Sequence, residues 1–223
     1  MEVVFSFLET NKVWFSAAQA ISSAISLLAW LIAVPTIIIL WRRGTISGFN
    51  LGPLGFQFRA AVEATAAAAR ASRANSPNQK IDIPRIESAV APAFKPEISN
   101  NLIGKAVLWV DDNPANNRLG VRALRKLQLD VEQVKSTEEA LSSITNRHFD
   151  LIISDMGRGQ NMRAGYDLLK SVREFDPAIP FFIFAGSDLP KFRREAAELG
   201  AQLSTNDMVE LIDNVIKFLG RRT

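Results

Sequence analysis

Residues 107–112 read Val-Leu-Trp-Val-Asp-Asp, and residues 151–155 read Leu-Ile-Ile-Ser-Asp. Each stretch is a short apolar run that ends in one or two carboxylates. That arrangement is costly inside a core, because carboxylates are rarely buried without partners. At the carboxyl edge of a parallel sheet, by contrast, such side chains line the crevice where ligands bind. The two runs therefore predict neighbouring strands whose acids, Asp111, Asp112 and Asp155, form a pocket for a hard divalent cation.

From Lys105 onward, short apolar runs alternate with amphipathic segments. We expect strands at 106–110, 131–134, 151–154, 181–184 and 201–203, and helices at 115–127, 138–145, 165–174, 189–199 and 208–219. Ser136 followed by Glu139 is typical of a helix start, and Gly200 is typical of a helix end. Five βα units of this length predict an α/β domain over residues 105–220, a flavodoxin-like, doubly wound, five-stranded parallel sheet. In that topology the first and third strands are neighbours.

This segment resembles the receiver domain of two-component response regulators. The resemblance rests on Asp111-Asp112-Asn-Pro after the first strand, Asp155 at the end of the third, Gly165-Tyr-Asp-Leu-Leu at a helix start and Gly200-Ala before the fifth strand. It implies that Asp155 accepts a phosphoryl group from a histidine kinase or phosphotransfer protein. It also implies a Mg²⁺ ion held by Asp111, Asp112, Asp155 and the backbone carbonyl of Gly157. The chemistry is consistent, because a divalent ion offsets the repulsion between a carboxylate and an incoming phosphoryl group.

Three features of the receiver family are missing from this chain. The family's fourth strand usually ends in Thr or Ser, where this chain has Ala185, and Ser187 is a candidate substitute. The family's lysine after the fifth strand has no counterpart in residues 204–207, and its fifth-strand aromatic residue is absent. Loss of the lysine should weaken stabilisation of a phosphoryl group. Arg158 and Arg163, in the loop after the third strand, are candidates to replace it; the alternative is that they are solvated.

The amino-terminal part of the chain predicts a membrane anchor. Residues 13–41 contain no charged residue, and this run exceeds the ~20 apolar residues that a spanning helix needs. It is too long for a cleaved signal peptide, and a buried core helix is the remaining alternative. Because Arg42 and Arg43 follow it, the positive-inside rule places the rest of the chain in the cytoplasm. We therefore expect a single-pass protein of the inner membrane, with residues 1–12 as a short leading segment.

Residues 42–104 are expected to form a juxtamembrane linker that is partly helical. The stretch 58–74 is rich in alanine, the best helix former, and its face of methyl groups predicts a solvated or self-pairing helix. Residues 83–94 predict a second short helix with Pro84 at its first position. The basic excess of this segment favours contact with membrane lipid over nucleic acid. Small residues spaced four apart in the predicted anchor are a weak indication of a homodimer.

Composition narrows the possible functions. The chain has 223 residues, no cysteine and one histidine, His148, which excludes a disulfide framework and a zinc site built on thiolates. We favour a membrane-anchored receiver of a phosphorelay, because all three acids remain. The alternative is a pseudo-receiver that binds partner proteins without phosphorylation. A hydrolase using Asp155 lacks a second acid or base to activate water, so no enzyme is expected. The three residues after the predicted domain, 221–223, suggest no DNA-binding output module.

Overall fold

The structure is a computed structural model, and it describes residues 53–72, 81–186 and 189–221. The described residues from Pro53 onward belong to one compact unit. Within the described ranges, no helix is both long enough and apolar enough to cross a membrane. The predicted span at 13–41 and the candidate Ser187 lie outside the described residues.

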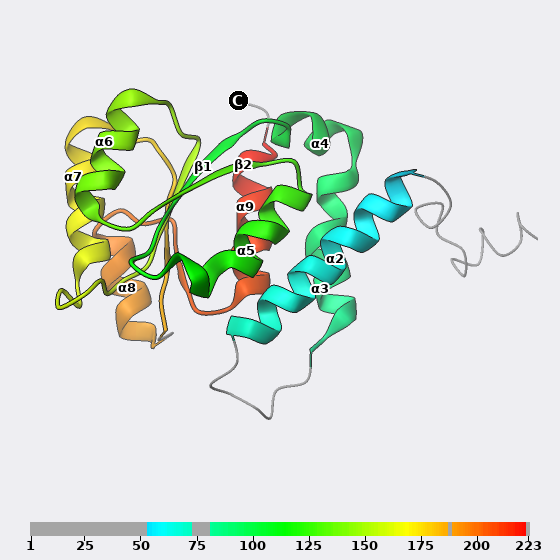
Figure 1. The fold of residues 1–223 in the computed structure, drawn as a ribbon, viewed down its shortest axis with the longest axis horizontal. Coiled ribbons are helices and arrows are strands. Elements are labelled where there is room, and N and C mark those ends of the chain that lie inside the picture. Colours follow the sequence, from blue (N-terminus) through cyan, green and yellow to red (C-terminus); the bar gives the residue numbers. More distant parts are fainter. Residues whose placement is uncertain (1–52, 73–80, 187–188, 222–223) are drawn as a thin grey trace, which may run out of the picture. The chain divides into compact units, whose positions relative to one another are not determined.

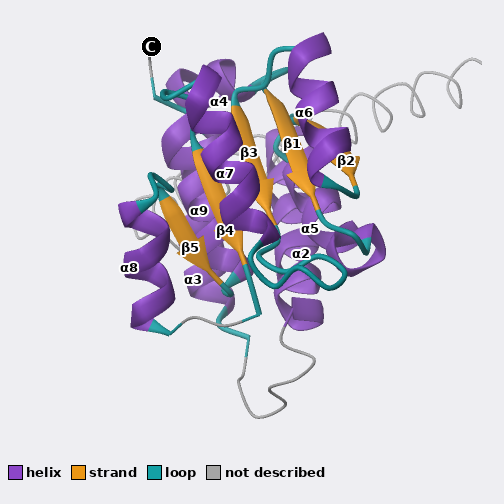
Figure 2. Cartoon of the chain, turned by 90° about the vertical axis from the view of Figure 1, so that its left-hand side faces the viewer, coloured by secondary structure: helices purple, strands orange, loops and turns teal. Residues whose placement is uncertain are grey.

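The sheet has five parallel strands in the order β2-β1-β3-β4-β5, and Figure 2 shows it between two layers of helices. The strands are β1 (Ala106–Val110), β2 (Asp130–Val134), β3 (Leu151–Ser154), β4 (Phe181–Phe184) and β5 (Leu203–Thr205). This order confirms the predicted topology. Val110 of β1 pairs with Ser154 of β3, so the two strands that precede the acids end side by side.

The fifth strand lies two residues later than predicted, at Leu203–Thr205 instead of 201–203. The N–H of Ala201 still donates to the carbonyl of Ala196 in the preceding helix (2.9 Å). This hydrogen bond ties Ala201 to the turn that follows α8, and the strand begins at Leu203. As a consequence Ser204, which was expected to follow the strand, lies within it.

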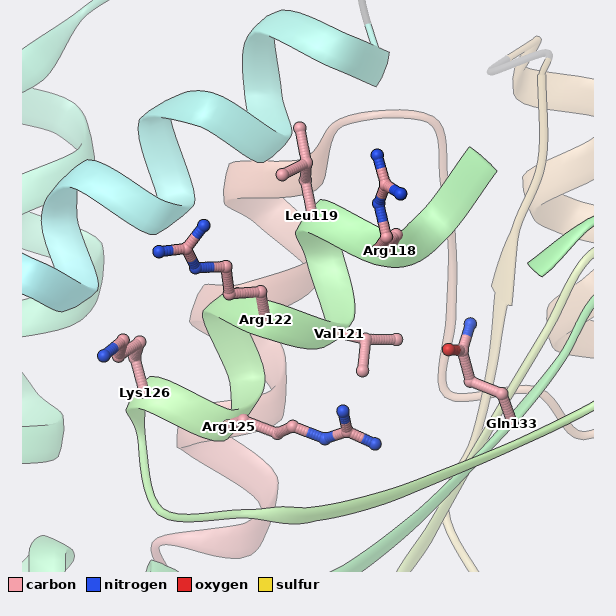
Figure 3. A pocket seen from close by; sticks show the side chains of 7 residues that line it. All are labelled: Arg118, Leu119, Val121, Arg122, Arg125, Lys126 and Gln133. Carbon is pink, nitrogen blue, oxygen red and sulfur yellow. The ribbon is translucent and has the colours of Figure 1, made fainter. Parts of the chain in front are cut away.

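Helices cover both faces of the sheet (Figure 1). One layer consists of α6 (Thr137–Asn146), α7 (Ala164–Phe175) and α8 (Pro190–Glu198), and the other contains α5 (Pro114–Lys126) and α9 (Met208–Leu219). These bounds agree with the predicted ones to within one residue. Alternate strand residues serve two separate cores: Val107 and Trp109 pack toward α5 and α9, whereas Leu108 and Val110 pack toward α6 and α7. Basic side chains lie along α5 (Figure 3).

The described part of the predicted linker is helical and packs onto the domain. It forms α2 (Pro53–Ser72), α3 (Ile83–Val90), the short 3₁₀ helix η2 (Ala91–Phe94) and α4 (Pro96–Leu102). Helix α2 packs against α5 and α9, and α3 packs against α9; Figure 1 shows this arrangement.

The alanine-rich face of α2 was expected to be solvated or to pair with a second copy of itself; in the structure it is buried in the core of the domain instead. Ala61 and Ala68 are at most 1% exposed, and they share one core with Val121 and Leu124 of α5. Small side chains bury little area by themselves, but they let two helix axes approach closely. The larger residues of the shared core then supply apolar area that stabilises this packing.

Candidate metal centre

Three carboxylates meet at the carboxyl edge of the sheet. Asp111 and Asp112 follow β1, and Asp155 follows β3. One carboxylate oxygen from each of the three lies within 4.8 Å of the others. The N–H of Asp155 donates to the carbonyl of Val110 (2.8 Å), so the strand ends themselves hold the acids together. The cluster expected from the two apolar runs is therefore present.

Asp111 is the most firmly held of the three acids. Its side chain is 6% exposed, and one of its oxygens accepts the N–H of Asn113 (2.7 Å). Its other oxygen accepts the side-chain amide of Asn117, which is itself buried in the first turns of α5. Asn117 was not predicted from the sequence as part of the site. The signal that could have found it is a polar residue on the buried face of the helix that starts beside the acid pair.

Asp112 and Asp155 each keep one oxygen for a ligand. Asp112 accepts the N–H of Gly159 (2.7 Å), and Asp155 accepts the N–H of Met156 (2.8 Å). Within the described part of the chain, the second oxygen of each carboxylate accepts no hydrogen bond. These two oxygens are the ones best placed to bind a cation.

The electrostatics of the cluster also favour a cation. Burial, and then repulsion from Asp111, raises the pKa of Asp155 to about 6. Burial likewise raises the pKa of Asp111, and the neighbouring Asp112 adds to the effect. A divalent cation would relieve both the repulsion and the loss of solvent. A cluster that offers only oxygen ligands suits Mg²⁺, so the residues present fit this ion.

Arg158 is a buried guanidinium next to the acids, and only 7% of it is exposed. It donates hydrogen bonds to Ser154 Oγ (2.7 Å), the Asp155 carbonyl (3.0 Å), Thr137 Oγ1 (2.8 Å) and the Ala164 carbonyl (2.7 Å). Burial lowers the pKa of Arg158, and the charges of the acids oppose this shift. The sequence suggested Arg158 as a replacement for the missing lysine. In the structure Arg158 places a positive charge beside the acids, but both of its terminal nitrogens already donate hydrogen bonds within the protein.

The second candidate, Arg163, lines the pocket beside Asp155, but its guanidinium already has partners in the protein. It pairs with Glu195 of α8, and its guanidinium lies 4.9 Å from the centroid of the Tyr166 ring.

Gly157 is the residue whose backbone carbonyl the family resemblance assigns to the metal. It lies in the β3–α7 loop and lines the same pocket as Asp155.

The start of α7 fits against the acid cluster only because Gly165 has no side chain. A Cβ atom at Gly165 would lie 2.7 Å from the carbonyl oxygen of Asp155 and 3.0 Å from the Cα of Met156. The N–H of Gly165 donates to the carbonyl of Met156 (2.8 Å). This close approach fixes the loop that carries Gly157 beside the phosphoryl-acceptor candidate.

A largely apolar pocket of about 510 Å³ opens beside Asp155. It lies where the family has its hydroxyl and lysine, and here Ala185 and Ser204 line it together with Tyr166 and Phe192. The N–H of Ala185 donates to a β5 carbonyl (3.0 Å). Because Ala185 stands at this position, the described part of the pocket wall has no threonine or serine directly after β4 that could contact a phosphoryl group.

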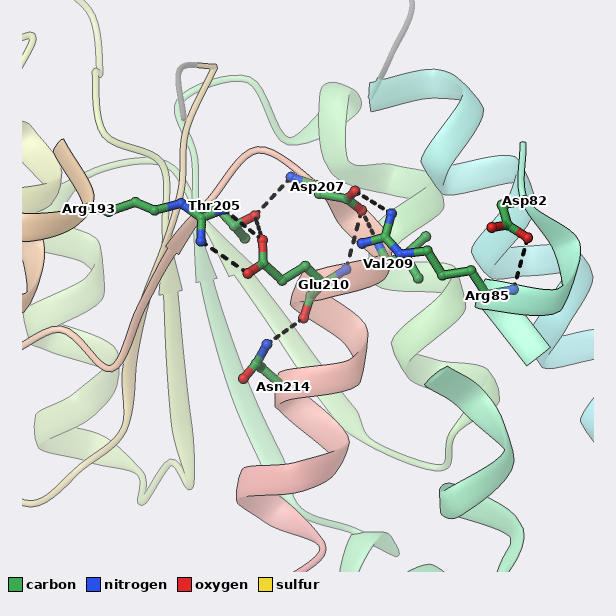
Figure 4. Close-up of polar contacts among 8 residues, drawn as sticks. All are labelled: Asp82, Arg85, Arg193, Thr205, Asp207, Val209, Glu210 and Asn214. Carbon is green, nitrogen blue, oxygen red and sulfur yellow. Dashed lines mark hydrogen bonds and ion pairs between the residues drawn. The ribbon is translucent and has the colours of Figure 1, made fainter. Parts of the chain in front are cut away.

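A polar network occupies the turn after β5, where the family has its lysine (Figure 4). Thr205 Oγ1 donates to Glu210 (2.5 Å) and accepts the N–H of Asp207 (3.0 Å). Arg193 of α8 contacts both oxygens of Glu210 (3.1 and 2.9 Å), and Arg85 of α3 pairs with Asp207 (2.8 Å). Burial raises the pKa of Asp207, but hydrogen bonds from Arg85 and the α9 backbone outweigh it and hold this pKa below its ordinary value. The network joins α3, α8 and α9 around β5.

Comparisons with known proteins identify part of the chain. Residues 107–204 match the family model of the response regulator receiver domain. The chain is similar to the sensor protein EvgS of Escherichia coli K12, with 29% identity over 98 residues that make up 44% of this chain and 8% of EvgS. It is also similar to the methanol utilization control regulatory protein MoxX of Paracoccus denitrificans, with 29% identity over 96 residues that make up 43% of each protein. The chain thus spans less than half the length of either relative.

Two solved structures illustrate the same similarity. One is the non-phosphorylated HemR receiver domain from Leptospira biflexa, with 20% identity, a TM-score of 0.48 and coverage of 53% of this chain and 97% of that one. The other is the response regulator TrrA from Thermotoga maritima in complex with Mg²⁺ and BeF, with 21% identity, a TM-score of 0.45 and coverage of 52% and 99%. With the family match, the sheet order and the acid cluster, residues 107–204 are a response regulator receiver domain of the two-component type.

Proposed function

We propose that this protein is the receiver component of a phosphorelay, in which Asp155 accepts a phosphoryl group. The observation that supports the proposal is that one carboxylate oxygen from each of Asp111, Asp112 and Asp155 lies within 4.8 Å of the others. Mg²⁺ bound by these acids would offset the negative charge of the phosphoryl group. The donor would be a histidine kinase or a phosphotransfer protein.

The residues of the site have separable roles in the proposed transfer. The N–H of Met156 holds one oxygen of Asp155 and so orients the carboxylate. The other oxygen forms a bond to phosphorus as the bond from phosphorus to the donor's leaving group breaks, and the leaving group takes its proton from solvent. Arg158 contributes a permanent positive charge near the acids, an effect that is strong where water is partly excluded.

The residues beside the site limit the conformational response that phosphorylation can produce. Ala185 offers no hydroxyl to the phosphoryl group, and the turn after β5 holds Thr205 and Asp207 in a network of its own. We therefore propose that phosphorylation alters contacts at the sheet edge without the hydroxyl and aromatic rearrangement of ordinary receivers. These same features favour the second candidate, a pseudo-receiver that binds a partner protein without being phosphorylated.

Incubation of the full chain with a small phosphoryl donor and Mg²⁺ distinguishes the two candidates. Intact mass should show one phosphoryl adduct that is absent with EDTA and absent in Asp155→Asn. Glu174→Gln, which removes an exposed carboxylate from α7, should be labelled like the wild type. If the folded wild-type protein gains no adduct, the phosphorelay proposal fails and the pseudo-receiver remains.

We also propose that the receiver is held at the inner face of the cell membrane by residues 13–41. The support is the absence of charged residues in this stretch and the two arginines, Arg42 and Arg43, directly after it. A reporter fused after Thr223 should be active only in the cytoplasm. Activity only on the outer side would contradict this orientation, and recovery of the chain in the soluble fraction would contradict the anchor.

A further inference from the structure

A cleft of about 530 Å³ runs along α5, separate from the acid cluster in its lining residues. Its lining consists of Arg118, Leu119, Val121, Arg122, Arg125, Lys126 and, from β2, Gln133. Figure 3 shows the basic side chains extending from successive turns of the helix. No carboxylate is among the lining residues, so the cleft is a concave surface of a single charge sign.

The four basic residues of this cleft have no acidic partner within the described part of the chain. Helix α5 itself contains no acidic residue, and the one hydrogen bond made by these side chains there is from Arg125 to the carbonyl of Val131 (2.8 Å). Some exposed cations elsewhere on the domain do have acidic partners: Arg147 pairs with Asp130, and Lys217 pairs with Asp213. Like charges grouped without partners repel one another, and a bound anion would remove that repulsion.

The helix dipole explains only half of the cluster. Arg125 and Lys126 lie in the last turn of α5, where positive charge interacts favourably with the carbonyl end of a helix. Arg118 and Arg122 lie in the earlier turns, where the dipole gives no such benefit. Their position is better explained by a ligand that contacts the whole length of the row.

The spacing and chemistry of the row suggest the kind of ligand. Arg118, Arg122 and Lys126 are four residues apart, so the row spans about 12 Å along the helix axis. Guanidinium groups bind phosphate oxygens through paired N–H donors. The cleft adds the side chain of Gln133, whose amide nitrogen donates to the carbonyl of Pro114 (3.3 Å), and apolar lining from Leu119 and Val121. We propose that this cleft binds a compact oligophosphate, such as the phosphate chain of a nucleoside triphosphate or an inorganic polyphosphate.

The concave shape favours a compact ligand over the flat surface of a membrane. Ligand sites commonly have volumes of about 300–1,000 Å³, and the cleft falls in this range. The proposal requires neither Mg²⁺ nor Asp155, so it can fail without affecting the phosphorelay proposal, and the reverse is also true.

Calorimetric titration of the full chain with inorganic tripolyphosphate tests the site. The buffer contains EDTA and no Mg²⁺, so that the acid cluster cannot recruit the ligand through a metal ion. We expect saturable binding that the double variant Arg118→Gln/Arg122→Gln weakens by about tenfold or more, because two charge-assisted contacts are lost. Arg194→Gln, which removes an exposed arginine from α8, should bind like the wild type. Circular dichroism should show that all variants are folded.

Three results would overturn the proposal. The first is wild-type binding that does not saturate, and the second is a loss in Arg194→Gln as large as in the double variant, since both indicate general attraction to a basic protein. The third is binding of vesicles rich in phosphatidylglycerol, reduced in the double variant, with no binding of tripolyphosphate. That outcome would assign the face to a membrane surface instead.

Discussion

Replacing Asp155 by asparagine should stabilise the metal-free protein at neutral pH. The pKa of Asp155 is about 6 in the folded protein, whereas an aspartate in an unfolded chain has a pKa of about 3.9. Between these two values the folded state binds the proton more tightly than the unfolded state does. The contribution of Asp155 to the free energy of unfolding therefore falls as pH rises from about 4 to about 6, and above that range it stays at its low value.

The size of this effect follows from the shift in pKa. A shift of about 2 units corresponds to about 2.8 kcal/mol, and because the carboxylate is partly exposed, solvent screening reduces the penalty to on the order of 1–2 kcal/mol. Asparagine has nearly the same shape and still offers an oxygen to the N–H of Met156. We therefore expect Asp155→Asn to raise the free energy of unfolding by this amount at pH 7 and by little at pH 4.

Urea unfolding of both proteins between pH 4 and pH 7, in the presence of EDTA, gives the free energies of unfolding that test this prediction. The difference between wild type and Asp155→Asn isolates the one carboxylate from other titrating groups. Millimolar Mg²⁺ should stabilise the wild type more than the variant and so close the gap at pH 7. Glu174→Gln serves as the control for loss of an exposed carboxylate. A lower stability of Asp155→Asn than of the wild type at pH 7 without metal would contradict this prediction.

Other substitutions test the remaining parts of the account, each by urea unfolding followed by circular dichroism. Arg158→Met should lower the free energy of unfolding by about 3 kcal/mol, because it leaves several buried acceptors and hydroxyls without a donor; an unchanged stability would show that its hydrogen bonds do not matter. Gly165→Ala should cost about 1–3 kcal/mol, since its Cβ overlaps the carbonyl of Asp155 and overpacking has this cost. Ala68→Arg should cost about 3 kcal/mol or more by burying a charge between α2 and α5, whereas Ala71→Arg, on the exposed side of α2, should be nearly neutral; equal effects would contradict the packing of α2.

The sheet and its acid pocket could be predicted from the sequence because their signals are local. Each buried strand is an apolar run bounded by polar residues, and the acids come directly after β1 and β3. The parallel topology then places Asp111, Asp112 and Asp155 together without any knowledge of the packing. Positions where the family's residues are missing, such as Ala185, are also visible in the sequence alone.

The packing of α2 and the partners of Arg158 could not be predicted in this way. The alanines of α2 carry little hydrophobic signal, and their burial depends on which helix lies opposite them. Arg158 contacts Thr137, which is 21 residues away in the chain, so its role depends on tertiary structure. The fifth strand was misplaced because Ala201 continues the apolar pattern but is bonded to the preceding helix.

Amide NMR of the full chain during a Mg²⁺ titration shows whether the three carboxylates form a cation site. At millimolar Mg²⁺ we expect the signals of Asn113 and of the loop from Asp155 to Gly159 to shift together with one affinity. In Asp155→Asn the same shifts should require much higher Mg²⁺ concentrations. If these signals stay in place while the protein is folded, the acid cluster does not bind the ion and the account is wrong.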